Sequence, residues 1–310
     1  MKTAPWIFSG LLAAGLLAPD RIWAAPDAGQ KPTPRPMGEI RVKGYYDHPT
    51  SRWNIALRIS DPWHSGDYFL YRLPEGFSLN DRPYLQQPQG TSQWATVQPE
   101  AAPEWRLDEA EKSTGYAIRF YDGIELSLAI WAGKDEVTFR YVLRNNTASA
   151  VEPRTGSCFM LWTAPHFIDR RQERTFIWVN RKPVALSDIP PTPKDMKRWP
   201  YAVIGVGAVK KFEETKTRWM RPTAADHGLV CIQSQDGART IGLAWSPADS
   251  IFARSTIPCV HSEPKWPPVP PGQAVQATGK LYFSDQGVAE IQKRFANDTE
   301  KGVIGVKLIP

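Results

Sequence analysis

Apolar and polar residues alternate with a period of two along most of this chain. Every second residue is apolar in Trp53–Ile59, and the same alternation occurs in Ile124–Ile130 and Val137–Leu143. Strict alternation places successive side chains on opposite faces of a β-strand, so that one face is buried and the other meets solvent. The pattern therefore predicts half-buried strands.

Further strand-like runs continue toward the C-terminal end. Turn-forming pairs such as Asp122-Gly123, Asp236-Gly237 and Pro271-Gly272 separate several of them. The additional strands are predicted at residues 40–46, 68–73, 116–121, 158–163, 175–179, 201–209, 229–234, 240–245 and 276–283.

A single good helix is predicted near the end of the chain. Asp285 is its expected N-cap, and Val288, Ile291 and Phe295 follow at helical spacing. A dozen or more antiparallel strands with one short C-terminal helix predict an all-β fold. Its expected architecture is a large sandwich of two antiparallel sheets.

The N-terminal residues have a different pattern. Met1-Lys2 precedes a mainly apolar run, Trp6–Leu17, and small residues follow at Ala24-Ala25. This order is typical of a secretory signal peptide, which we expect to span residues 1–25. The apolar run is too short to cross a bilayer and no later run is longer, so no transmembrane segment is expected. The protein is therefore predicted to be exported to the periplasm or the medium.

The remaining chain is expected to form one domain. Residues 26–38 are rich in proline and read as an extended linker. Residues 39–310 then make up a single β-supersandwich, a size at the upper end for one domain.

Several segments resemble the galactose-mutarotase-like β-supersandwich. They are "DRPYLQQPQG" (81–90), "EVTFRYVLRNNTASAV" (136–151), "CIQSQDGARTIGLAW" (231–245), "PCVHSEP" (258–264) and "PPGQAVQATGKLYF" (270–283). Aldose epimerases and domains of several polysaccharide lyases and glycosidases share this fold, and a group of exported bacterial proteins has a similar order of segments. The resemblance implies a carbohydrate partner. The histidine and glutamate motifs of aldose epimerases are missing here, which favours a lyase or a glycoside hydrolase.

The best candidate for acid–base chemistry is the segment around His261. Cys259, His261 and Glu263 occupy alternate positions, so in a strand they share one face. A carboxylate beside a histidine can orient it or share its proton. His261 and Glu263 are therefore predicted catalytic residues, although His261 could equally be a hydrogen-bonded structural residue.

His166 is a third predicted catalytic residue, because it follows a strand end and precedes a basic run. His166, His227 and His261 could converge on a metal ion. Metal-binding spacings such as HxH, HExxH and CxxC are missing, so no metal is expected. His48 and His64 lie among turn-forming residues and are the weakest candidates. The Gly-x-Gly of "GVGAVKK" (205–211) lacks a third glycine, and no cofactor is expected.

The three cysteines, Cys158, Cys231 and Cys259, leave the thiol chemistry open. In an oxidising compartment two of them could form a disulfide, or all could be buried free thiols. Cys259 is the only one near a base. Two positions along a strand separate its Cα from that of His261 by about 6–7 Å, which argues against cysteine catalysis.

Positive charge is concentrated in one part of the chain. Residues 170–221 contain 13 Lys or Arg and five acidic residues, a net of +8, whereas the rest of the mature chain has a net of −3. This predicts an anionic partner, and export makes nucleic acid an improbable one. The predicted substrate-binding residues combine basic and aromatic side chains: Arg82, Tyr84, Arg154, Arg170, Arg171, Trp178, Trp199 and Trp219.

Three classes of function remain open from sequence. The first is an enzyme acting on an acidic or decorated polysaccharide. The second is a carbohydrate-binding protein without catalysis, and the third is a structural component of the cell envelope. A lyase needs a base and a cationic side chain to neutralise the uronate carboxylate, whereas a hydrolase needs two carboxylates. Glu263 is the one convincing carboxylate candidate.

Overall fold

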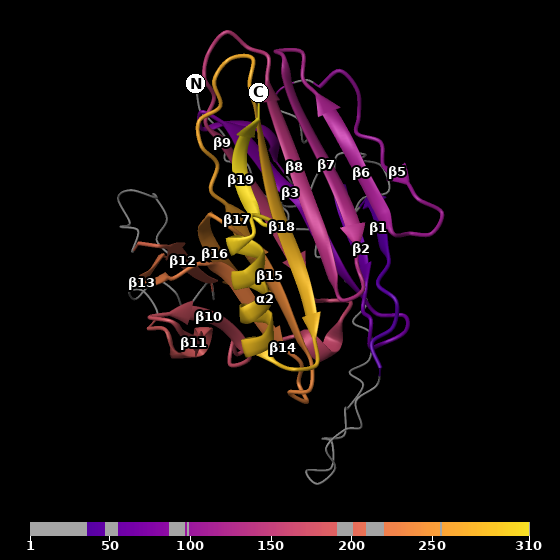
Figure 1. The fold of residues 1–310 in the computed structure, drawn as a ribbon, viewed down its shortest axis with the longest axis vertical. Coiled ribbons are helices and arrows are strands. Elements are labelled where there is room, and N and C mark those ends of the chain that lie inside the picture. The colour runs from indigo at the N-terminus through magenta and orange to yellow at the C-terminus, as the bar shows by residue number, and fades with distance from the viewer. Residues whose placement is uncertain are drawn as a thin grey trace, which may run out of the picture. The chain divides into compact units, whose positions relative to one another are not determined.

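Strand pairing divides the protein into two large sheets (Figure 1). The computed structural model describes residues 36–46, 55–86, 97, 99–190, 201–208, 220–254 and 256–309. The predicted signal peptide and residues 26–35 of the predicted linker lie outside this range. So do His48, Trp199 and Trp219.

The nine-stranded sheet has the order β1-β2-β3-β9-β17-β16-β12-β13, with β4 paired to β3. All of its pairs are antiparallel except β12–β13, which is parallel and departs from the prediction. The connection between these two strands, residues 207–219, has the dozen residues that a parallel crossover needs. The strands are β1 (Val42–Tyr46), β2 (Ile55–Ser60), β3 (Tyr68–Leu79), β4 (Arg82–Gln86), β9 (Pro153–Met160), β12 (Tyr201–Val206), β13 (Met220–Ala225), β16 (Ala248–Arg254) and β17 (Cys259–Pro264).

The ten-stranded sheet has the order β11-β10-β14-β15-β18-β8-β7-β6-β5, with β19 paired to β18. Two short 3-10 helices lie in connections between the two sheets, η1 (Pro165–Phe167) between β9 and β10 and η2 (Leu186–Asp188) between β11 and β12. The strands are β5 (Arg106–Leu107), β6 (Ser113–Arg119), β7 (Ile124–Ala132), β8 (Glu136–Asn145), β10 (Thr175–Val179), β11 (Lys182–Ala185), β14 (Gly228–Gln233), β15 (Thr240–Trp245), β18 (Ala274–Ser284) and β19 (Gly305–Ile309).

Aromatic side chains from both sheets meet in the core. The ring of Tyr71 on β3 lies 5.1 Å from that of Phe139 on β8, and Phe69 lies 6.0 Å from Phe283 on β18. Trp245 on β15 is fully buried beside them and donates to the Tyr71 hydroxyl. Each strand thus turns one face toward the opposite sheet, as the alternation predicts. The predicted all-β sandwich is confirmed.

Helix α2 (Val288–Glu300) covers the outer face of the ten-stranded sheet (Figure 1). Its buried residues Ile291 and Phe295 pack against Tyr282 and Leu229. The helix was expected to start from Asp285, and this N-cap is wrong. Its N-cap is Gly287, whose φ of 87° turns the chain out of β18. In the described part of the chain, no helix is long and apolar enough to span a bilayer.

The outer face of the nine-stranded sheet carries two of the three predicted catalytic residues, His261 and Glu263. Val260 on β17 is part of the core between the sheets, so its neighbours Cys259 and His261 project to the opposite, outer side. β17 pairs with β16 on one side and with β9 on the other. The site is therefore built on three adjacent strands in the middle of a sheet.

Candidate functional site

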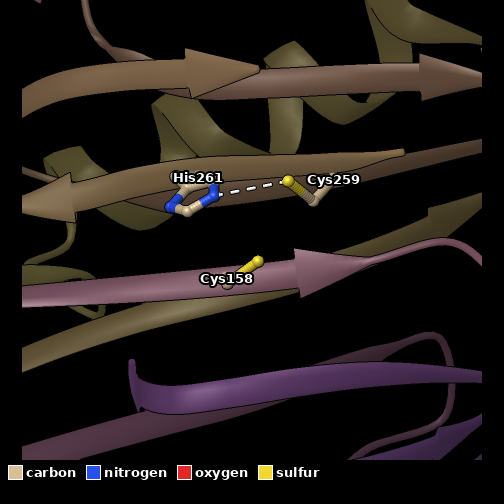
Figure 2. Close-up of side chains that lie close together, drawn as sticks. All are labelled: Cys158, Cys259 and His261. Atoms are coloured by element: carbon tan, nitrogen blue, oxygen red, sulfur yellow. Dashed lines mark hydrogen bonds between the residues drawn. The ribbon is translucent and has the colours of Figure 1, made fainter. Parts of the chain in front are cut away.

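Two cysteines and a histidine come together on this outer face. Cys259 pairs with Met160 across the β17–β9 ladder, and the same register brings His261 opposite Cys158. The thiol sulfurs and an imidazole nitrogen all lie within 4.8 Å of one another. Figure 2 shows the three side chains gathered across the two neighbouring strands. All three residues are buried.

His261 connects this thiol pair to two carboxylates. Its Nε2 lies 3.5 Å from Cys259 Sγ, and its Nδ1 lies 3.3 Å from Glu263 Oε1 and 3.9 Å from Glu75 Oε2. Exposure of the side chains rises from 10% for His261 to 16% for Glu263 and 33% for Glu75. The cluster therefore reaches solvent at Glu75, which the sequence analysis did not single out.

Glu263 is held in place from the side of β9. Both of its carboxylate oxygens accept from the Ser157 backbone N–H, at 3.1 and 3.0 Å. Burial raises the pKa of Glu263, although His261 and the Ser157 amide favour its charged form. The carboxylate thus has a fixed position from which to orient the imidazole.

The thiols and the imidazole strongly perturb one another. A hydrogen bond from the Cys158 thiol, helped by His261, lowers the pKa of Cys259 to about 5 even though burial opposes ionisation. Burial by itself lowers the pKa of His261, but contacts with Cys259 and Glu263 outweigh it and raise this pKa to about 10. The Cys158 pKa rises well above its usual range, because its thiol donates a hydrogen bond to Cys259 and is buried. These contacts favour ionisation of Cys259 over ionisation of Cys158.

This geometry corrects the argument made against Cys259 from strand spacing. The Cα separation had suggested that its thiol and His261 are too far apart, but the side chains lean together and their heteroatoms are 3.5 Å apart. All three cysteines are free and buried. Cys231 packs separately, under α2.

Two arginines flank the cluster on neighbouring strands. Arg72 on β3 pairs across from Cys158, and Arg254 on β16 pairs across from Cys259. The Arg72 guanidinium lies 3.7 Å from Glu75. The outer face thus combines carboxylates, an imidazole and cations. Neither arginine is among the residues predicted from sequence.

His166 lies in a different cluster. Its ring stacks on His64, with centroids 3.9 Å apart, and Asp67 is close to both. His64 is held between Asp61, at 2.8 Å, and the guanidinium of Arg239, at 3.2 Å. Burial, helped by the adjacent His64, lowers the pKa of His166. His64 and His166 thus form a second polar cluster, apart from the one around His261.

The three histidines that could have converged on one ion do not do so. His227 packs between Trp178 and Phe295, with ring centroids 5.3 and 4.8 Å away, on the side of the molecule covered by α2. Burial lowers the pKa of His227. Of the predicted catalytic residues, the structure brings together His261 and Glu263.

Two of the four predicted sugar-contacting aromatic residues, Trp178 and Tyr84, lie in the described part of the chain, and both are buried. Trp178 is 4% exposed beneath α2, so its ring has no free face for stacking. Tyr84 is 6% exposed, packs on Phe77 and Phe120, and donates its hydroxyl to Asp122. Both are core residues.

The predicted basic contacts are exposed, and one shares the face of the cluster. Arg154 lies on β9 four residues before Cys158, about 13 Å along the strand, and pairs with Asp81 at 2.9 Å. Arg82 is exposed on β4, and Arg170 and Arg171 are exposed after η1. Arg154 is therefore the best placed of the four to contact a ligand that extends from the cluster.

No protein-family model matches the chain, and no curated protein matches it in sequence. Solved structures do match. An α-N-acetylgalactosaminidase from Bifidobacterium bifidum, in complex with GalNAc, has 14% identity and a TM-score of 0.46 over 86% of this chain and 38% of that one. A galactose mutarotase related enzyme from Lactobacillus acidophilus has 11% identity and a TM-score of 0.41 over 74% and 94%. A galactose mutarotase-like protein from Clostridium acetobutylicum has 9% identity and a TM-score of 0.41 over 80% and 99%.

The matches include galactose-mutarotase-like proteins, as the sequence resemblance predicts. This likeness extends to the fold alone. The chain spans about two fifths of the B. bifidum enzyme, at 38% of its length. Any statement about activity therefore has to come from this chain's own residues.

Proposed function

We propose that this protein is exported and processes an acidic polysaccharide at the cluster on the outer face of the nine-stranded sheet. The observation that carries the proposal is the contact of His261 with Glu263 and Glu75 beside solvent. Proton-carrying groups in mutual contact at a solvent-facing edge suit general acid–base catalysis. The resemblance of the sequence to the galactose-mutarotase-like fold supports a carbohydrate as the substrate.

The flanking arginines support an acidic substrate. A lyase removes the proton alpha to a uronate carboxylate, and a nearby cation stabilises the charge that develops. Glu75, positioned by its contact with His261, would take the proton, and Arg72 and Arg254, on the strands that flank the cluster, would bind the carboxylate. The lyase reaction is therefore the one that assigns a role to the most side chains of the cluster.

Glycoside hydrolysis is the second reaction that this site could catalyse. Glu75 and Glu263 both approach His261 Nδ1, so these carboxylate oxygens are at most about 7 Å apart, a limit that is compatible with the separation of about 5–5.5 Å in retaining glycosidases. His261 lies between them, however, where a glycosidic bond would have to fit. We therefore favour the lyase.

Substrate class is tested by comparing acidic and neutral polysaccharides. We expect unsaturated products from a uronate-containing glycan, with activity that falls as salt rises, because charges beyond about 8 Å are screened at physiological salt. Arg254→Gln should raise KM for that glycan. The matched control is Arg119→Gln, an exposed arginine on the other sheet. Retention of only neutral sugars without salt dependence would exclude an acidic substrate. Binding without turnover would leave the carbohydrate-binding alternative.

Export is tested separately. The positive, apolar and small-residue order of residues 1–25 supports cleavage after Ala24 or Ala25. We expect N-terminal sequencing of protein from the periplasm or medium to begin at Ala25 or Pro26. Soluble cytoplasmic protein that retains Met1 would contradict this proposal.

A further inference from the structure

The thiol–imidazole group has the spacing of a set of metal ligands. Zinc lies about 2.3 Å from a thiolate and about 2.0–2.1 Å from an imidazole, so a tetrahedral arrangement places sulfur and nitrogen about 3.6 Å apart. Cys259 Sγ and His261 Nε2 are 3.5 Å apart. The Cys158 sulfur completes a set in which every pair of donors is within 4.8 Å.

The surroundings of His261 match those of a metal-bound histidine. A histidine that coordinates a metal through one nitrogen commonly donates its other N–H to a carboxylate, which fixes the ring. Here Nδ1 faces Glu263, and Glu263 is itself fixed by the Ser157 amide. This chain of contacts directs Nε2 toward the two sulfurs.

A disulfide suits the same cysteines less well. Cys158 and Cys259 are diagonal neighbours on adjacent strands, a placement that separates Cα atoms by about 7–8 Å. Disulfides usually need about 4.4–6.8 Å. The sulfurs are close, but the Cα separation is longer than a disulfide usually allows and suits an ion bound between the two sulfurs.

The type and number of donors indicate which ion. Two thiols and one imidazole select zinc over the oxygen-preferring magnesium and calcium. Within the described residues the group has three donors, the number found in zinc sites that leave the fourth position open. The cluster meets solvent at Glu75, which is 33% exposed beside the same imidazole.

We infer that Cys158, Cys259 and His261 bind one Zn²⁺ ion with an open fourth position. This goes beyond the proposed function, since zinc binding can be measured without any sugar and either idea can fail alone. A bound ion uses the electron pair of His261 Nε2. Glu75 is then the group left to carry a proton to or from a substrate.

The experiment is a zinc titration of the chelator-treated, reduced wild-type protein. We expect one tightly bound ion per chain, and Co²⁺ in its place should show thiolate-to-cobalt charge-transfer bands. Glu263→Gln should weaken zinc binding by about 10–100-fold, and Cys259→Ser or Cys158→Ser should weaken it further. The control is Cys231→Ala, which removes a buried thiol under α2 and should leave affinity unchanged.

The cobalt spectrum of the wild-type protein keeps the test decisive if a cysteine variant fails to fold. Failure to bind a stoichiometric ion, or a cobalt complex without thiolate bands, would overturn the inference. Binding that survives Cys259→Ser and disappears in His166→Gln would overturn it too, because the ion would then lie at His64, Asp67 and His166.

Discussion

Replacing His261 by alanine is expected to reduce turnover of an acidic glycan by about 10²–10⁴-fold, the usual contribution of general acid–base catalysis, because Glu75 loses the imidazole that positions it. The variant removes the one side chain that contacts Cys259, Glu263 and Glu75. The measurement is kcat and KM on the best substrate from the polysaccharide comparison. Thermal unfolding of the same variant is recorded alongside.

The matched control is His227→Ala, a partly buried histidine under α2. It should leave turnover unchanged in protein that remains folded. A purely structural His261 would instead cost about 1–3 kcal/mol of unfolding free energy and leave specific activity intact. That outcome would show that the segment "PCVHSEP" (258–264) stabilises the fold and takes no part in catalysis.

Lys280→Met is expected to lower the free energy of unfolding by about 3–5 kcal/mol. Lys280 on β18 is 5% exposed, and its ammonium lies 2.6 Å from Glu136 and 2.9 Å from Asp298. Tyr282 donates to the same Asp298 carboxylate. Removing the ammonium leaves the largely buried Asp298 carboxylate without its lysine partner, whereas Glu136 keeps Arg294 at 3.1 Å. Chemical denaturation followed by tryptophan fluorescence measures the loss.

Lys307→Met on β19 is the control, because this lysine is exposed and no shift in stability beyond about 0.5 kcal/mol is expected. Losses of similar size in both variants would show that the buried network contributes nothing special. A loss confined to Lys280→Met would identify the network as the attachment of α2 to its sheet.

Most of the fold was predictable because alternation is a local property. β7 and β8 show it residue by residue, and their burial follows the pattern. The shared face of His261 and Glu263 was predictable for the same reason. Short or irregular strands such as β4, β13 and β19 lack a clear alternation, and their positions depend on pairing with distant strands.

The rest of the site depends on register between strands far apart in sequence. Glu75 reaches His261 from a stretch where the β3–β9 ladder shifts, and nothing local marks it. Cys158 joins Cys259 only because β9 lies next to β17. Trp178 was misjudged because burial is set by tertiary packing, which residue type alone does not reveal, and the stacking of His64 on His166 has the same origin.

β9 joins the N-terminal strands of its sheet, through β3, to the C-terminal strands, through β17. The cluster spans this junction, so it comes into existence only when the two halves of the sheet have joined. Shielding of the Cys158 and Cys259 thiols from an alkylating reagent therefore reports completion of the sheet during folding. A chain truncated before residue 259 would lack β17 and therefore Cys259 and His261. It would also leave the β9 edge unpaired, which favours aggregation.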